Sequence, residues 1–275
     1  MKGRARERAD VLLHEQGSAG SREEAKRLIM AGVVFAGSER VNKPGAQYPV
    51  EEMLHVRSAL HPFVGRGGVK LQRALDVFRV SLSGRVVLDV GASTGGFTDC
   101  ALRAGASSVY AVDVGYGQLA WKLRTDPRVR VFERTNFRHM EVDVFSPRPD
   151  AAVMDVSFIS IVKLLPRLAA ALLPDSPVLA LVKPQFEAGP DKVGKGGIVR
   201  DAQIHEEVLR RVLRQSGEHG FAALGATASP ILGGDGNREF LLWLQSPPTA
   251  RAAVDIDVPR VVARAADAVA TGENG

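Results

Sequence analysis

A glycine-rich loop between two apolar segments constrains the fold of this chain more than any other feature. The run DVGASTGGFTD spans residues 89–99, after the β-branched run at 85–88 and before an apolar helix-like segment at 97–103. A strand, a tight glycine turn and a helix in this order are typical of the first unit of a nucleotide-binding α/β sheet. Gly91 and Gly95 let the backbone turn sharply and approach a ligand, because glycine has no Cβ.

Two further residues narrow the class of ligand. Ser93 stands where the full dinucleotide fingerprint has its middle glycine, so the loop suits an adenosine-containing cofactor without a pyrophosphate on bare backbone. The next strand ends at Asp113, about 20 residues beyond the loop, where an acidic side chain binds ribose hydroxyls. These features favour S-adenosylmethionine over NAD. An ordinary tight turn followed by a surface aspartate is the alternative.

Strand and helix patterns alternate from residue 84 onward. Strands are predicted at 86–89, 109–113, 129–133, 151–155 and 178–182, and helices at 161–173, 202–217 and 258–270. Two late strands, 222–229 and 240–245, flank a glycine-rich turn and are expected to form a hairpin. The pattern predicts an α/β fold, a Rossmann-like doubly wound sheet with an antiparallel edge.

Four charged residues are candidates for the chemistry. Asp155 and Lys183 end neighbouring predicted strands, where ligands of such sheets bind. Lys70 opens the helix at the start of this domain, and Glu239 follows the late turn. Taken singly, each residue is more often a surface charge or part of a structural ion pair. Together, two carboxylates and two ammonium groups can hold one another in defined charge states.

Residues 1–58 predict a separate small α+β domain. Helices are expected at 4–16 and 22–31, the second capped by Ser21 with Glu24 as its capping-box partner. Short strands are expected at 33–35, 39–41 and 53–56. A linker at 59–69 joins this domain to the large domain at 70–248, and a tail at 249–275 follows.

Basic residues in two segments predict contacts with RNA. The candidates are Arg4, Arg6, Arg22, Lys26, Arg27 and Lys43 in the small domain, and Lys192 and Lys195 in the segment 186–200. The net charge of +5 favours a polyanionic partner only weakly. The segment 186–200 is glycine-rich and is expected to be a mobile loop that closes over RNA. Solvated helix faces and a flexible loop are the alternatives.

Several functions are not expected. The single Cys100 excludes an internal disulfide, and the scattered His residues predict no metal site. No apolar run is long enough to span a membrane, and the N-terminus lacks a signal region. We therefore expect a cytoplasmic protein, a monomer without a membrane partner.

The chain resembles a known family in seven motifs. These are GGVKL, DVGASTGGFTD, VDVGYGQLAWKLR, ERTN, DVSFIS, LVKPQFE and GNREFLLWL. Together they resemble the TlyA group of ribosomal RNA 2′-O-methyltransferases, within the FtsJ-like class, over nearly the whole chain. The segment ADVLLHEQG…SREEAKRLIMAGVVFAG…VNKPG is similar to the RNA-binding domain first seen in small-subunit ribosomal protein four.

The resemblance implies a cofactor, a substrate and site residues. It implies S-adenosylmethionine-dependent 2′-O-methylation of cytidine in ribosomal RNA, in 23S and, from the tail, also in 16S. The implied catalytic set is Lys70, Asp155, Lys183 and Glu239. The implied cofactor residues are Asp89, Gly91, Ser93, Gly95, Phe97, Asp113 and Val114, with Asn136 near the adenine. Lys183 would act as a base, or would orient the hydroxyl and stabilise the alkoxide, while Lys70 and Glu239 hold the ribose.

One stretch departs from the family, and three other functions remain as alternatives. The linker reads HPFV at 61–64, without the tryptophan that members of the family carry. Phe63 keeps an aromatic ring there but not the indole N–H, so the resemblance gives weaker support for a linker role in coupling RNA binding to cofactor binding. The alternatives are a non-catalytic ribosome-assembly factor, a haemolysin-like protein and a small-molecule methyltransferase.

Overall fold

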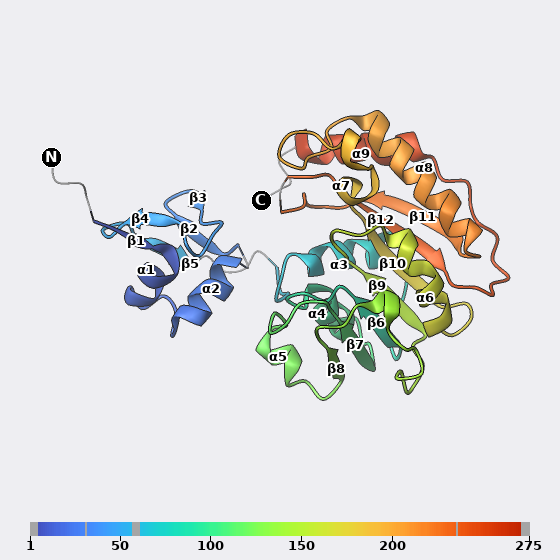
Figure 1. The fold of residues 1–275 in the computed structure, drawn as a ribbon, viewed down its shortest axis with the longest axis horizontal. Helices are drawn as coiled ribbons and strands as arrows, with labels where there is room; N and C mark the ends of the chain where they lie inside the picture. Colours follow the sequence, from blue (N-terminus) through green and yellow to red (C-terminus); the bar gives the residue numbers. More distant parts are fainter. Residues whose placement is uncertain (1–4, 31, 57–60, 235, 271–275) are drawn as a thin grey trace. The chain divides into compact units, whose positions relative to one another are not determined.

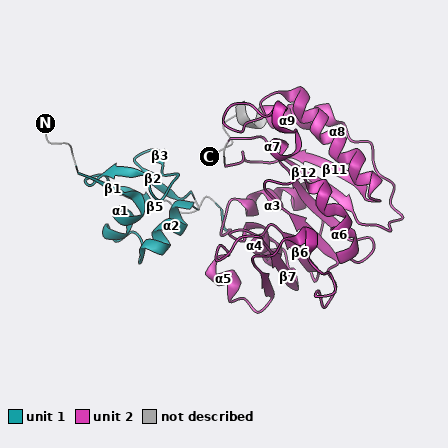
Figure 2. Ribbon diagram, viewed as in Figure 1, with its two compact units in different colours: residues 1–62 teal, residues 63–275 magenta. Residues whose placement is uncertain are grey.

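The computed structural model describes residues 5–30, 32–56, 61–234 and 236–270. The chain divides into two compact units, residues 1–62 and 63–275 (Figure 2). Arg4, one of the predicted RNA-binding residues, lies outside the described residues. Each unit has its own apolar core.

Unit 1 packs two helices against two small antiparallel sheets. Its elements are β1 (Arg6–Arg8), α1 (Ala9–Glu15), α2 (Arg22–Met30), β2 (Val34–Ala36), β3 (Glu39–Arg40), β4 (Gln47–Pro49) and β5 (Leu54–Val56). Strand β1 pairs with β4, and β2 lies between β3 and β5. Leu13, Ile29 and Leu54 are fully buried and join the helices to the second sheet. This is the α+β module that the sequence predicts.

The start of the first helix differs from the prediction. Residues 6–8 form strand β1 because they pair with β4, with Arg8 opposite Gln47, and Arg8 has extended backbone (ψ 141°). The predicted helix at 4–16 is therefore wrong at residues 5–8. At α2 the predicted cap is present: Ser21 Oγ accepts from the Glu24 N–H at 3.1 Å, and Glu24 accepts from Gly20 N–H at 2.7 Å.

Unit 2 is built on a seven-stranded sheet in the order β11-β12-β10-β9-β6-β7-β8 (Figure 1). The strands are β6 (Val86–Val90), β7 (Ser108–Val112), β8 (Val129–Phe132), β9 (Ala151–Met154), β10 (Pro177–Val182), β11 (Ala222–Ala228) and β12 (Phe240–Gln245). The first five are parallel, and β12 runs antiparallel to both β10 and β11. The Rossmann-like sheet with an antiparallel edge is confirmed, and each strand bound lies within one residue of its prediction.

Helices cover both faces of this sheet. They are α3 (Gly67–Phe78), α4 (Gly96–Arg103), α5 (Trp121–Arg124), α6 (Leu165–Ala171), α7 (Pro184–Glu187), α8 (Ala202–Glu218) and α9 (Val258–Ala270), with short 3₁₀ turns η1 (Phe137–His139), η2 (Ile161–Leu164) and η3 (Pro190–Lys192). Alternate strand residues face opposite cores: Val87 packs with α3 and α4, and Leu88 with α6 and α8.

One predicted helix begins differently. The segment predicted at 161–173 opens as the 3₁₀ turn η2 and becomes α-helical only at Leu165. Pro166 stands at the start of α6, where its missing N–H costs no helical hydrogen bond. Ser160 accepts from Val162 N–H and thereby ends the loop that leaves β9. This loop carries part of the candidate site.

Candidate active site

An ion pair joins the ends of two neighbouring parallel strands. Asp155 directly follows β9, and Lys183 directly follows β10. The Lys183 Nζ atom lies 2.6 Å from Asp155 Oδ1 and donates a hydrogen bond to Ser157 Oγ at 3.0 Å. Both charged side chains are mostly buried. A cation at the sheet edge is thus held in place by a carboxylate and a hydroxyl.

A second, more deeply buried ion pair lies close by. Lys70 on α3 and Glu239 before β12 are 9% and 3% exposed, with Nζ and Oε2 2.5 Å apart. Burial raises the pKa of Glu239, and the Lys70 charge and hydrogen bond oppose that rise. The charge of Asp155 raises and that of Lys183 lowers the same pKa. The four residues predicted from separate motifs therefore form one electrostatic cluster.

Glycines bring backbone and side chains of this cluster close together. Gly91 has φ +88°, and a Cβ there would lie 2.4 Å from the Asp155 carbonyl oxygen. Gly95 has φ +96°, and its Cβ would lie 2.3 Å from Leu123 Cδ1. Both glycines are required by the packing of the protein itself. This packing is a second reason for glycine at both positions, beside the room for a ligand that the sequence predicts.

The loop and the next strand form a recess. Asp113 follows β7 and accepts hydrogen bonds from Ser93 N–H at 2.8 Å and from Gly115 N–H at 2.6 Å. The lining includes Ser93, Asp113, Gln118 and Glu133. A carboxylate oxygen has more than one lone pair, so Asp113 can hold the loop and still accept a ligand hydroxyl. Sequence reasoning missed Gln118 and Glu133, because neither stands at a strand end or in the glycine loop.

Asp89 is a buried carboxyl with a free acceptor. Its Oδ2 atom accepts from Thr98 Oγ1 at 2.6 Å, whereas Oδ1 is buried without a hydrogen-bond partner among the described residues. Burial raises the pKa of Asp89 to about 7, and the charges of Asp155 and Asp113 add to the rise. A cationic group placed beside Oδ1 would compensate the buried charge. The site therefore fits a ligand that carries an ammonium group.

Three cofactor residues implied by the resemblance are not among the residues that line the recess. Val114 is exposed, and neither it nor Asn136 lines the recess. Asn136 caps η1, where its Oδ1 accepts from Arg138 N–H at 3.1 Å. Phe97 is buried, and a Cβ on Gly67 would lie 3.3 Å from its ring. In the structure Val114 therefore faces solvent, Asn136 caps a 3₁₀ turn, and Phe97 packs in the core.

An exposed aromatic residue directly follows Ser157, which accepts a hydrogen bond from Lys183. Phe158 follows Ser157, has φ +65° and is 90% exposed. Its ring lies 4.9 Å from that of Phe186, three residues beyond Lys183. A left-handed backbone is costly for a bulky residue and marks a local constraint. Sequence reasoning missed Phe158, although an aromatic residue just after a strand end was the signal available.

A buried carboxyl fastens the two loops that carry this pair. Glu187 on α7 accepts from Ile161 N–H at 2.9 Å, so the segment after β10 is tied to the segment after β9. Burial raises the pKa of Glu187, and the Ile161 N–H, Ser160 and the Arg211 charge oppose the rise. The positions of Asp155 and Lys183 therefore depend on a carboxyl outside the cluster.

The segment 186–200 is attached to neighbouring elements at Lys192 and near its C-terminal end. Lys192 forms an ion pair with Glu207 on α8. The Val199 N–H donates to Asn237 Oδ1 at 3.0 Å, and Asn237 Nδ2 donates to Gly197 O at 2.9 Å. The expected basic loop is thus attached to the turn that carries Glu239. Lys195 is exposed, whereas Lys192 already has a carboxylate partner.

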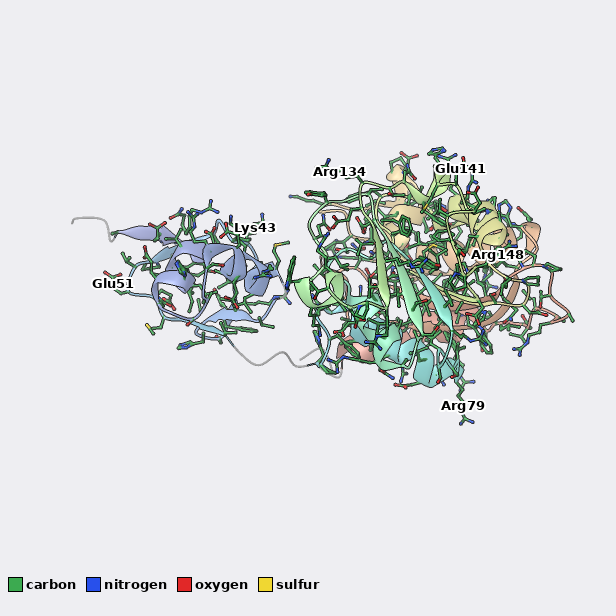
Figure 3. The ribbon with its side chains drawn as sticks, turned by 90° about the horizontal axis from the view of Figure 1, so that it is seen from below. Lys43, Glu51, Arg79, Arg134, Glu141 and Arg148 are labelled. Atoms are coloured by element: carbon green, nitrogen blue, oxygen red, sulfur yellow. The ribbon has the colours of Figure 1, made fainter. Side chains whose placement is uncertain are left out.

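The other predicted RNA-binding residues lie on unit 1. Arg6 donates to the Gln47 carbonyl at 2.5 Å, and Lys26 lies 3.8 Å from Glu23. Arg27 and Lys43 are exposed, and Figure 3 shows Lys43 at the surface of this unit. On unit 2, Arg134 lies at the surface (Figure 3), with its guanidinium 4.1 Å from the ring centroid of the exposed Tyr116. Each unit presents cations to solvent.

The part of the chain that the structure describes contains neither a membrane-spanning helix nor a cluster of metal ligands. Among its helices, none has the length and apolar content needed to cross a bilayer. No three His, Cys, Asp or Glu side chains of those residues gather closely enough to hold a metal ion.

Comparisons with known proteins agree with this geometry. The sequence profile described as FtsJ-like methyltransferase matches residues 63–246. A Bacillus subtilis protein named "Putative rRNA methyltransferase YqxC" is 53% identical over 243 residues, which cover 88% of this chain and 86% of that protein. The Mycobacterium tuberculosis "16S/23S rRNA (cytidine-2'-O)-methyltransferase TlyA" is 44% identical over 88% of this chain and 90% of its own length.

Further similarity is found to proteins named as haemolysins. "Hemolysin A" of Brachyspira hyodysenteriae is 40% identical over 85% of this chain and 98% of its own length. A solved structure, "Putative hemolysin from Streptococcus thermophilus", has a TM-score of 0.78 at 46% identity and covers 98% of both chains. The similarity therefore extends over both units.

Proposed function

The chain belongs to the FtsJ-like methyltransferase family, and from this premise we propose that it methylates the 2′-hydroxyl of cytidine in ribosomal RNA. The cluster of Lys70, Asp155, Lys183 and Glu239 beside the recess carries the proposal. The 44% identical relative named as a 16S/23S rRNA cytidine-2′-O-methyltransferase supports the substrate class. The cluster favours an enzyme over a non-catalytic assembly factor or a haemolysin-like protein.

S-adenosylmethionine is the cofactor, and it supplies an electrophilic methyl group when bound. Asp113 would accept hydrogen bonds from its ribose hydroxyls, at the recess that Gln118 and Glu133 also line. Asp89, whose Oδ1 atom has no partner among the described residues, would face its ammonium group. A buried acceptor and a carboxylate-lined recess thus match the two polar ends of this molecule.

Lys183 would act on the ribose hydroxyl of the RNA. Methyl transfer forms an oxygen–carbon bond, breaks a carbon–sulfur bond and releases the hydroxyl proton. The contacts of Lys183 with Asp155 and Ser157 hold its ammonium group in place, so that it orients the hydroxyl and stabilises negative charge on its oxygen. Asp155 is the adjacent carboxylate that accepts the proton. The Lys70–Glu239 pair holds the ribose, so that oxygen, carbon and sulfur are aligned.

The experiment supplies the purified protein with S-adenosylmethionine and ribosomal subunits that lack 2′-O-methylcytidine. Small and large subunits are tested separately, and digested nucleosides are analysed by mass spectrometry. The proposal predicts 2′-O-methylcytidine in the large subunit, with the small subunit as a second substrate. Methylation of bases alone, or none on either subunit by protein that binds the cofactor, would overturn it.

A further inference from the structure

Two arginines of unit 1 share one buried carboxylate. Arg8 reaches Asp10 through two hydrogen bonds, Nε to Oδ1 at 2.9 Å and Nη2 to Oδ2 at 3.1 Å. Arg22, the first residue of α2, approaches the same Oδ2 with its Nη2 atom at 3.5 Å. Two guanidinium groups from different elements are thereby held side by side.

Burial is unequal across this group. The Asp10 side chain has no solvent exposure, whereas the side chains of Arg8 and Arg22 are 43% and 48% exposed. Burial opposes ionisation of Asp10, but the hydrogen bonds and charges of Arg8 and Arg22 outweigh it and lower the pKa of this carboxyl. The carboxylate lies beneath, and two cations face solvent above it.

A third cation lies on the adjoining loop. The Asp10 N–H donates to the Pro44 carbonyl at 3.0 Å, which fixes the loop after Lys43 against the start of α1. A Cβ on Gly45 would lie 3.1 Å from Arg8 Nη1, so this glycine leaves room for the Arg8 guanidinium. Lys43 is exposed. The two arginines and the loop of Lys43 therefore adjoin one another on this unit.

We infer that Asp10 is a positioning residue that holds Arg8 and Arg22 as a two-guanidinium site for a backbone phosphate of the RNA. A guanidinium has five N–H donors in a fixed plane, and Asp10 engages only two of those of Arg8. The remaining donors match phosphate oxygens in the bidentate geometry that arginine favours. The inference rests on the proposed function for its ligand class, a structured RNA.

The direction in which one substitution changes RNA affinity distinguishes this inference from simple charge attraction. Asp10→Asn removes a negative charge from a surface that would bind a polyanion, so charge alone predicts tighter RNA binding. Positioning predicts the opposite, because an amide nitrogen cannot accept from Arg8 and the two guanidinium groups lose their common anchor. Glu23→Gln is the matched control, because it removes the same negative charge from an exposed residue that lies near Lys26.

The experiment measures binding of the full-length protein to large-subunit RNA at several salt concentrations. We expect Asp10→Asn to bind about tenfold more weakly, with a smaller dependence of affinity on salt because a phosphate contact is lost. In the methylation assay we expect Asp10→Asn to raise the KM for RNA and to leave the dissociation constant of S-adenosylmethionine unchanged. Glu23→Gln binds as tightly as the unaltered protein or more tightly.

Hydrogen exchange of α1 and α2 shows whether Asp10→Asn unfolds unit 1. If it does, Arg8→Lys and Arg22→Lys test the inference in its place. Lysine keeps the charge but not the planar donors, so each variant is expected to bind several-fold more weakly. Equal or tighter RNA binding by a folded Asp10→Asn, or unchanged binding by both lysine variants, overturns the inference. If the unaltered protein binds no ribosomal RNA, the proposed function fails instead.

Discussion

The Nζ atom of Lys183 lies 2.6 Å from Oδ1 of Asp155, at the ends of two adjacent parallel strands. The other lysine of the cluster, Lys70, has a separate carboxylate partner in Glu239. Each ammonium group thus has its own counter-ion, and the first pair is more exposed than the second. The side chains of the Lys183–Asp155 pair are therefore the more accessible of the two pairs.

Removing the Lys183 ammonium should slow methyl transfer strongly, with little effect on cofactor binding. Lys183→Ala is expected to lower kcat by roughly 10²–10³-fold, because a preorganised charge next to the reacting oxygen is lost. The dissociation constant of S-adenosylmethionine, measured calorimetrically, should stay within a few-fold. Lys183→Arg is the control that keeps the charge but changes its position. Near-normal turnover by the alanine variant would remove Lys183 from the chemistry.

The Lys70–Glu239 pair should be coupled in stability as well as in activity. Glu239→Gln leaves the Lys70 charge buried without a carboxylate, and such a loss costs about 3–5 kcal/mol. The double variant Lys70→Met/Glu239→Leu should be more stable than Glu239→Gln, yet inactive. Both tryptophans of the chain, Trp121 and Trp243, lie in unit 2, so urea unfolding followed by their fluorescence measures this unit. Additive stability effects of Lys70→Met and Glu239→Leu, each measured alone and compared with the double variant, would refute the coupling.

Asp89 should make the stability of unit 2 depend on pH. Its pKa is about 7 in the fold, above the ordinary 3.8, because the carboxyl is buried. Folding thus favours the protonated form of Asp89. The stability that this protonation gives the folded state is fully present below about pH 4 and is lost as pH rises through 7. One pKa unit corresponds to about 1.36 kcal/mol, so the loss amounts to about 4 kcal/mol.

Asp89→Asn removes this titrating group, so comparison with the unaltered protein measures how much the group changes stability with pH. The unfolding free energy of the variant relative to the unaltered protein should rise by up to about 4 kcal/mol between pH 4 and pH 8. Urea unfolding by tryptophan fluorescence at four pH values measures it. Asp143→Asn, at an exposed position, serves as the control and should leave the profile unchanged. A constant difference between Asp89→Asn and the unaltered protein would contradict the prediction.

Strand ends could be read from the sequence because parallel strands end at a common edge. Apolar runs that stop at a polar residue therefore placed Asp155 and Lys183 together, and the structure joins them in one ion pair. The Asp10 carboxylate shared by Arg8 and Arg22 could not be read in this way. Arg8 was assigned to a helix, and it is extended because β1 pairs with β4, about forty residues along the chain.

Other parts of the site depend on contacts that no local pattern encodes. Gln118 and Glu133 reach the recess from a loop and from the end of β8, so only the folded sheet brings them together. Asn136 and Val114 were assigned by resemblance alone, and the structure places neither in the lining. The left-handed backbone of Phe158 has no local signal either, since glycine and asparagine are the residues usual at positive φ.

Phe158 yields a prediction in which stability and activity move in opposite directions. Its side chain is 90% exposed, so removing it forfeits little burial, and its φ of +65° is strained for any residue with a Cβ. Phe158→Gly relieves that strain and should leave unit 2 as stable as before, or more stable by up to about 1 kcal/mol. An exposed ring on the residue after Ser157, the hydrogen-bond partner of Lys183, is suited to stacking against a base of the RNA substrate, which is worth about 1–3 kcal/mol per base. We therefore expect the KM for RNA to rise by about tenfold, with unchanged cofactor affinity.

Phe158→Leu keeps an apolar side chain without an aromatic face and should show the same activity loss without the gain in stability. Full activity of both variants would exclude stacking, and a large stability loss in Phe158→Gly would show that the ring packs against Phe186 to hold the loop instead.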